Sequence, residues 1–178
     1  MTFLDLVKKR RSCRKYTSRD VPPACIARCL EAARLAPSAC NSQPWRFIVI
    51  TDPALRARAA EAAFSGIYKM NVFVKGAPIL VAVIRERAKF AARVGASLRG
   101  VQYSLIDLGI ACDHFTLQAA EEGLGTCWLG WFNERGVKKA LGLPRRVKID
   151  VLLSVGYSQD DGIVEKIRKP LDEMSEIK

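Results

Sequence analysis

Residues 37–45 read Pro-Ser-Ala-Cys-Asn-Ser-Gln-Pro-Trp, and they separate a helical apolar pattern from a β-type apolar run. Pro37 and Pro44 cannot continue a helix or a central strand, so the residues between them are expected to form an ordered loop. The loop carries small, amide and hydroxyl side chains, which would face outward. It therefore marks both a boundary in the fold and a candidate site for a polar ligand.

The patterns on either side of this loop predict strands interleaved with helices. Apolar runs predict strands at 46–51, 78–84, 126–130 and 149–156, and helical spacing predicts helices at 23–36, from 52, at 94–122 and at 133–141. Gly123 is expected to cap the longest helix, whose largely apolar circumference indicates burial in the domain or at a subunit interface. This order of elements favours an α+β or three-layer fold.

Length and composition favour one cytoplasmic globular domain. A chain of 178 residues can bury a sizeable core, and no segment is as apolar as a membrane span of roughly 18 residues or a signal peptide. The formal charge of +11 favours anionic partners, but the basic clusters are short and lack interleaved aromatics, so nucleic acid is not expected as a partner. The polar tail 158–178 has too few apolar residues to fold alone.

A second run supplies positive charge close to the N-terminus. Arg10, Arg11, Ser12 and Arg14 place three guanidinium groups and a hydroxyl within five residues. Arg can pair bidentately with phosphate oxygens, which Lys does less specifically. This run alone fits a phosphate site no better than it fits a solvated helix end or a non-specific polyanion patch.

Four more motifs follow in the second half of the chain. They are GLGTCWLG at 123–130, LGLP at 141–144, VGY at 155–157 and KIRKPL at 166–171. In this order, with the arginine run and the loop, they resemble the nitroreductase family of flavoproteins over nearly the whole chain. The resemblance implies a single domain, 1–178, folded as a three-layer α/β/α sandwich around a mainly antiparallel sheet. It also implies a homodimer in which residues 158–178 extend over the partner subunit.

The same resemblance implies FMN as the cofactor, bound between two subunits. The arginine run and the tail would bind the phosphate and ribityl end, the loop would meet the flavin from the neighbouring subunit, and the strand near residue 129 would present backbone N–H groups to N5 of the ring. The cofactor-binding residues so implied are Arg10, Arg11, Ser12, Arg14, Pro37, Ser38, Ala39, Asn41, Gln43, Asn71, Leu129, Gly130, Lys166 and Arg168.

No dedicated catalytic side chain is expected. The sole histidine, His114, lies in an apolar helical pattern and is expected to be buried and hydrogen-bonded, and no Gly-x-Ser-x-Gly or Walker motif is present. The six cysteines indicate reduced thiols, and the spacing of Cys25 and Cys29 is a weak metal signal, so no metal site is predicted. Reactive atoms would then belong to a cofactor.

The resemblance implies ping-pong hydride transfer from NADH or NADPH to a nitroaromatic, a quinone or a similar electron-poor acceptor. Within the family, the alternatives are flavin fragmentation, dehalogenation or dehydrogenation. Outside it, the alternative is a flavin-binding or basic scaffold protein without turnover. Two departures bear on this choice: Cys40 stands where the family commonly has glycine, and Trp131 stands where a smaller residue is usual.

Overall fold

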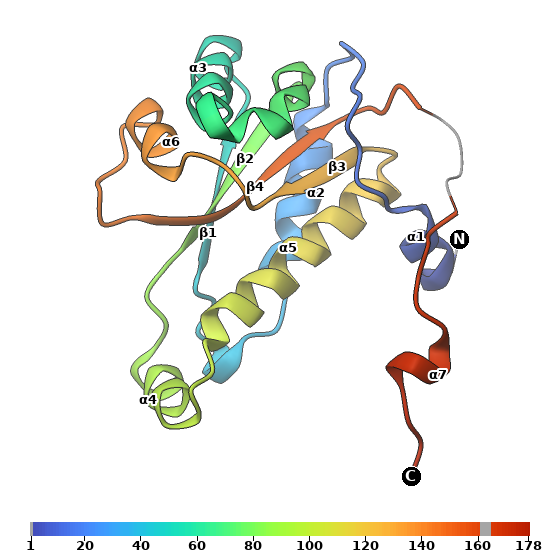
Figure 1. Ribbon diagram of the computed structural model, residues 1–178, viewed down its shortest axis with the longest axis vertical. Helices are drawn as coiled ribbons and strands as arrows, with labels where there is room; N and C mark the ends of the chain where they lie inside the picture. Colours follow the sequence, from blue (N-terminus) through green and yellow to red (C-terminus); the bar gives the residue numbers. More distant parts are fainter. Residues whose placement is uncertain (1, 161–164) are drawn as a thin grey trace.

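Four antiparallel strands form one sheet in the order β1-β2-β4-β3 (Figure 1). The computed structural model describes residues 2–160 and 165–178, apart from the side chains of residues 91, 93, 94 and 96. The strands are β1 (Trp45–Ile50), β2 (Ile79–Arg85), β3 (Gly125–Leu129) and β4 (Lys148–Gly156). Each lies within one residue of the predicted range, and the antiparallel α+β architecture is confirmed.

The two central strands bury apolar side chains on both faces of the sheet. In β2, Val81 faces one cluster of buried residues and Leu80 faces the other. In β4, Leu153 and Leu152 divide in the same way. Successive side chains of a strand point to opposite faces, so each face needs its own cover of helices. The sheet is therefore the middle layer of three, as predicted.

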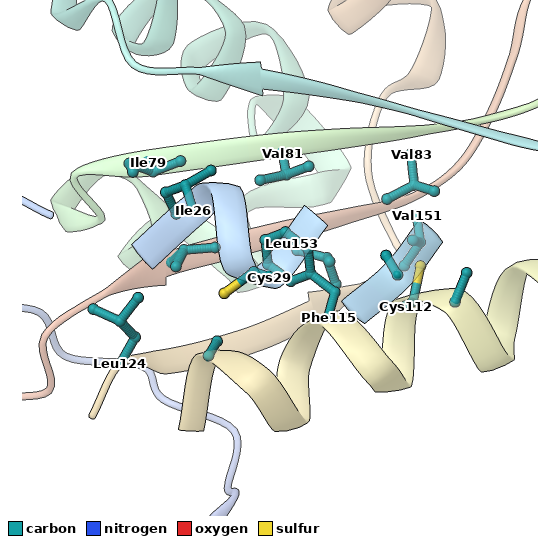
Figure 2. Close-up of a cluster of buried hydrophobic side chains, with 14 of the residues drawn as sticks. Ile26, Cys29, Ile79, Val81, Val83, Cys112, Phe115, Leu124, Val151 and Leu153 are labelled. Atoms are coloured by element: carbon teal, nitrogen blue, oxygen red, sulfur yellow. The ribbon is translucent and has the colours of Figure 1, made fainter. Parts of the chain in front are cut away.

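One face is covered by α2 (Pro23–Arg34) and α5 (Tyr103–Glu121), which pack on each other as well as on the sheet (Figure 2). α2 begins with a proline, which is tolerated in a first turn. On α5, Phe115 stacks on Phe47 of β1, with ring centroids 5.8 Å apart. Gly123 follows the helix with a φ of +77°, which confirms its predicted role as a C-cap.

The other face is covered by α3 (Pro53–Ala63), the 3₁₀ segment η2 (Gly66–Gly76) and α6 (Glu134–Ala140). Both α-helices begin at the predicted caps. The Asp52 carboxylate accepts from Leu55 N–H at 2.7 Å, and the Asn133 side chain accepts from Gly136 N–H at 2.9 Å. Residues 71–76, just before the predicted strand at 78–84, belong to η2.

A β-bulge at Asp150 places Ile149 and Val151 of β4 on opposite faces of the sheet. Val83 pairs with Val151 and Ile84 pairs with Ile149, so Asp150 is the extra residue. Without it, Ile149 and Val151 would point to the same face, whereas they belong to different clusters. The Asp150 carboxylate forms a 3.0 Å ion pair with Arg85.

The predicted single helix over 94–122 is wrong. The chain instead forms α4 (Phe90–Arg99) and then α5, with a break at Gly100, whose φ is +63°. Glycine adopts this left-handed conformation without the strain that a Cβ imposes. Apolar periodicity continues through the break, which explains the error. Leu98 and Leu105, two apolar residues within the predicted helix, are exposed.

The chain termini lie together at one side of the sheet (Figure 1). α1 (Phe3–Lys9) begins with a capping box made by Thr2 and Asp5, and α7 (Leu171–Met174) forms a single turn in the tail. Part of the predicted tail, residues 161–164, lies outside the described residues. Among the described helices, none is long and apolar enough to span a bilayer.

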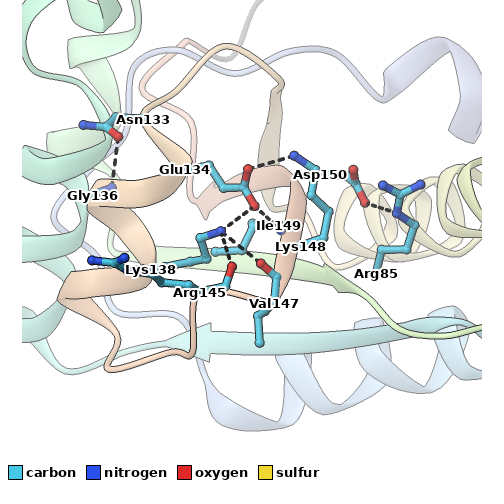
Figure 3. A network of polar contacts seen from close by, with 10 residues as sticks. All are labelled: Arg85, Asn133, Glu134, Gly136, Lys138, Arg145, Val147, Lys148, Ile149 and Asp150. Carbon is cyan, nitrogen blue, oxygen red and sulfur yellow. Dashed lines mark hydrogen bonds and ion pairs between the residues drawn. The ribbon is translucent and has the colours of Figure 1, made fainter.

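Glu134 ties the start of α6 to β4 (Figure 3). Its carboxylate accepts from Lys148 Nζ at 2.7 Å, from Ile149 N–H at 3.1 Å and from Lys138 Nζ at 3.2 Å. Desolvation by itself would raise the pKa of Glu134, but these three hydrogen bonds outweigh it and hold the pKa below its usual value. The network therefore stabilises the folded state with Glu134 ionised.

We expect Glu134→Gln to lower the free energy of unfolding by about 1–2 kcal/mol at pH 7, because charge-assisted hydrogen bonds are lost. A lowered folded-state pKa contributes stability above the unfolded value, and this contribution disappears as the pH falls through the folded value. The difference between variant and wild type should therefore vanish in acid. Urea unfolding at several pH values measures it. Glu61→Gln, which removes an exposed ion pair with Lys75, is the control and should change stability little.

Candidate functional site

The predicted arginine run lies along the free edge of β3. Cys13 N–H donates to the Thr126 carbonyl at 2.8 Å, and Ser12 forms a parallel bridge with the same residue. Gly125 makes this contact possible, because a Cβ there would lie 2.6 Å from the Cys13 Cβ. The run is thus fixed against the sheet although it belongs to no strand.

Buried residues within the run hold its exposed cations in place. Cys13 and Tyr16 are buried, whereas Arg14 between them is exposed. The Tyr16 hydroxyl donates to the Cys13 carbonyl at 3.0 Å and lies 2.7 Å from the Ser154 hydroxyl, and burial raises the pKa of Tyr16. These anchors leave the Arg14 side chain pointing away from the core.

The tail adds positive charge to this run. Burial, and after it the nearby charges of Arg10 and Arg168, lower the pKa of Lys166. The Lys166 ammonium also donates to the Val7 carbonyl. Arg10 and Arg168, two of the predicted cations, therefore lie close enough to Lys166 to disfavour its charge. Arg11 is directed elsewhere, because its guanidinium donates to the Ser158 hydroxyl at 3.3 Å and to the Asp160 carbonyl.

The end of β3 joins the same region. Desolvation raises the pKa of the buried Cys127 thiol, while Arg14, the Ser12 hydroxyl and Arg10 oppose this rise. β3 therefore lies beside the arginine run at Thr126 and Cys127. The last residue of β3, Leu129, is buried, and Gly130 after it is exposed.

Asn71 and Trp131 lie together just beyond β3. The Asn71 amide donates to the Trp131 carbonyl at 3.2 Å, so this predicted residue does reach the turn after Gly130. The Trp131 ring, 55% exposed, packs against Tyr68 with ring centroids 5.2 Å apart. In the described chain, Trp131 therefore packs against η2.

The predicted loop at 37–44 is ordered and contains the short 3₁₀ turn η1 (Ala39–Asn41). Inside the loop, the Ser38 hydroxyl accepts from the backbone N–H of Gln43 at 2.9 Å, and Asn41 Oδ1 accepts from the side-chain Nε2 of Gln43 at 2.7 Å. Pro37, Asn41 and Gln43 are exposed, whereas Ser38 and Ala39 are half-buried. The outward-facing polar loop is as predicted.

The loop and the arginine run lie at opposite edges of the sheet. The loop leads into β1, the run lies beside β3, and β2 and β4 stand between these two strands. Three strand spacings separate the edges by roughly 14 Å. In Figure 1 the loop lies near α4 and the arginine run lies on the side of α1. One chain by itself therefore does not bring the two predicted groups of cofactor-binding residues together.

One residue bearing on the loop was missed from the sequence. Asp107, on α5, is only 4% exposed, and its Oδ1 accepts from Ala39 N–H at 3.0 Å. The available signal was a carboxylate beside Leu108 in an otherwise apolar helical pattern. Periodicity alone assigns such a residue to the polar side of the helix.

The remaining titratable candidates are structural. His114 is half-buried, with Nδ1 3.3 Å from the Ala32 carbonyl oxygen, close to the predicted environment. Burial raises the pKa of Cys29 and of Cys112 to about 12, and all six thiols are free. Within the described residues, no cluster of His, Cys, Asp and Glu could hold a metal ion.

Comparison with known proteins identifies a family. A model of the nitroreductase family matches residues 7–157. The NADH dehydrogenase of Thermus thermophilus is 29% identical, with 86% of this chain and 85% of the relative covered. The iodotyrosine deiodinase of Thermotoga neapolitana is 28% identical, with 88% of each covered. The structure of an FMN-dependent nitroreductase from Clostridium difficile R20291 aligns with a TM-score of 0.72 and 26% identity, over 96% of this chain and 94% of that one.

We expect a maleimide to label native, FMN-free protein at Cys40 alone, because Cys40 is exposed and the other five thiols are buried. Mass spectrometry before and after denaturation distinguishes the sites, and all six should react in the unfolded chain. Cys40→Ser is the control and should leave the native protein unlabelled. Rapid labelling of Cys13 or Cys127 would contradict the packing of the arginine run against β3.

Proposed function

The chain belongs to the nitroreductase family, and we propose that it is an FMN-dependent oxidoreductase that uses NADH or NADPH to reduce electron-poor acceptors. The family match supports an oxidoreductase in general, and relatives named as NADH dehydrogenase and FMN-dependent nitroreductase support the donor and the cofactor. The acceptors proposed are nitroaromatics, quinones and similar molecules.

The gathering of cations beside β3 is the observation that carries this proposal: the arginine run is fixed by the Cys13 hydrogen bond to Thr126, and Lys166 is held next to it by its hydrogen bond to the Val7 carbonyl. A cluster of like charges is unfavourable until an anion binds, and the terminal phosphate of FMN is such an anion. Arg14 and the Ser12 hydroxyl lie beside the cluster, next to Cys127. These side chains fit the phosphate and ribityl end of the cofactor.

We propose that the complete site forms in a homodimer. A loop from one subunit would approach the arginine run of the other, because one chain keeps the two at opposite edges of its sheet. Apolar side chains exposed on α1, α5 and the tail support this assembly, since water is a poor environment for such a surface. They include Phe3, Leu4, Leu105, Ile106, Ile167, Leu171 and Met174.

The chain's own residues would bind and orient the cofactor. The cations would neutralise the phosphate, and Asn71 and the backbone around Leu129 and Gly130 would contact the ring. When bound, FMN supplies hydride acceptance from NAD(P)H and reduction of the second substrate. No catalytic side chain is proposed, and the open polar loop would border the space in which donor and acceptor bind in turn.

Reductive dehalogenation is a second candidate, favoured by the similarity to an iodotyrosine deiodinase over 88% of this chain. Anaerobic titration of FMN-loaded protein with NADH and with NADPH, followed by addition of a quinone or of iodotyrosine, separates the two activities. Reoxidation by quinone alone supports the general reductase. Iodide release supports dehalogenation, and a flavin that is not reduced by either donor contradicts both.

We expect replacement of Arg10 and Arg14 together by Ala to weaken FMN binding at least about a hundredfold, since two charge-assisted hydrogen bonds to phosphate are lost. Quenching of flavin fluorescence measures the affinity. Arg145 and Arg146, both exposed after α6, provide a control with the same change in charge and should keep wild-type affinity when replaced by Ala. Equal loss in both variants would point to general electrostatics instead of a phosphate site.

Mixing subunits tests whether the site is shared. We expect the Arg10/Arg14→Ala protein and an Asn41→Ala/Gln43→Ala loop variant each to bind FMN poorly as homodimers. When equal amounts are unfolded and refolded together, half of the dimers are mixed. Each mixed dimer has one intact site of two, so the mixture should bind about a quarter as much FMN as the wild-type protein. The absence of any recovery, with mixed dimers shown by mass spectrometry, would contradict a shared site.

A further inference from the structure

We infer that Asp107 is a positioning residue that holds the loop at 37–44 in the conformation required for ligand binding. The identity of the ligand, FMN, rests on the proposed function, but the role in fixing the loop does not. The inference comes from the backbone of the loop, the contact between the loop and α5, and the burial of the carboxylate.

The loop adopts a backbone that its residues do not favour. Cys40, Asn41 and Gln43 have φ values of +53°, +48° and +47°. The left-handed region is unfavourable for residues with a Cβ, although Asn tolerates it better than most. None of the three is glycine, so this conformation persists because contacts around it determine it.

Few of those contacts come from outside the loop. Glu86 N–H donates to the Pro44 carbonyl at 3.0 Å, and Lys89 N–H donates to the Ser42 hydroxyl at 3.3 Å, both near the end of the loop. At its start, Ala39 N–H donates to Asp107 Oδ1 at 3.0 Å. This bond attaches η1 to α5, immediately before the three left-handed residues begin.

The burial of Asp107 gives this bond its importance. The residue is 4% exposed, and among the described residues Asp107 Oδ2 has no hydrogen-bond partner. A buried carboxylate with only one of its two oxygens hydrogen-bonded makes the fold less stable than an apolar residue at the same position would. A group that is unfavourable for folding and attached to a strained, exposed loop is typical of a functional site.

The position of Asp107 on α5 explains how the loop is oriented relative to the rest of the domain. One turn further along α5, Ala111 and Cys112 are completely buried, so this part of the helix is fixed by the core. A rigid helix is a more accurate support for a ligand-binding loop than another loop. Asp107 transmits that rigidity to Ala39, and Ser38 and Asn41 are thereby placed toward the flavin of the partner subunit.

The test compares substitutions at both ends of the bond. Asp107→Leu removes the acceptor, whereas Asp107→Asn retains an oxygen that can accept from Ala39. Ala39→Pro removes the donor, and the backbone tolerates it because Ser38 before it is extended, with φ −150° and ψ 152°. Thr116→Val is the matched control, since Thr116 is buried on the same helix and its hydroxyl donates to the Asp113 carbonyl of that helix.

Two measurements are made on each variant: FMN affinity by fluorescence, and the rate at which a maleimide labels Cys40 in the FMN-free protein. We expect Asp107→Leu and Ala39→Pro to weaken FMN binding about tenfold, the equivalent of one hydrogen bond, and to change the rate at which Cys40 is labelled. Asp107→Asn and Thr116→Val should match wild type within about twofold. The double variant Asp107→Leu/Ala39→Pro should bind FMN no more weakly than the weaker of the two single variants, because both substitutions remove the same hydrogen bond.

The outcomes separate this inference from the proposed function. If wild-type protein does not bind FMN, the proposed function fails, and the labelling rate of Cys40 still decides the role of Asp107. If Asp107→Leu binds FMN and is labelled as wild type is, the inference is wrong. If Asp107→Leu and Asp107→Asn lose equal FMN affinity, the assigned hydrogen bond is overturned. If Thr116→Val loses as much FMN affinity as Asp107→Leu, the effect is a general one of destabilising α5, and the inference is overturned.

Discussion

The structure depends on two central strands that bury apolar side chains on both faces. β2 and β4 cannot leave either face in water, so helices must cover the sheet twice, and the bulge at Asp150 places Ile149 and Val151 on opposite faces. Because both faces are occupied by packed side chains, polar groups that could bind a ligand are left to the edges of the sheet. The arginine run and the polar loop are found there, on β3 and before β1.

That division explains why the proposed site needs residues from a second chain. The edges of a four-stranded sheet are kept apart by the strands between them, and no local rearrangement brings residues 10–14 to residues 37–44. A second copy of the chain is the simplest source of the missing part. The exposed apolar residues of α1, α5 and the tail fit the same explanation, since a surface that packs against a partner accounts for both observations.

Each part of the proposed site is fixed by a buried polar contact. Beside β3, Tyr16 follows the arginine run and bonds to Ser154 of β4, and Gly125 of β3 leaves room for the run to approach the strand. Before β1, Asp107 accepts from Ala39 below the left-handed residues. In both places a buried polar pair holds exposed polar groups outward, which an apolar core could not do because its packing does not specify the direction of a loop.

The sequence by itself determined the strands, the helix caps at Asp52, Asn133 and Gly123, the polar loop and the cation-rich run, because these depend on neighbouring residues. It also indicated the family through motifs in a fixed order. Only the tertiary structure decided the break at Gly100, which apolar periodicity hides, and the burial of Asp107, which a local pattern assigns to the surface. It also decided that the loop and the arginine run occupy opposite edges, because strand order is set by packing between residues far apart in the chain.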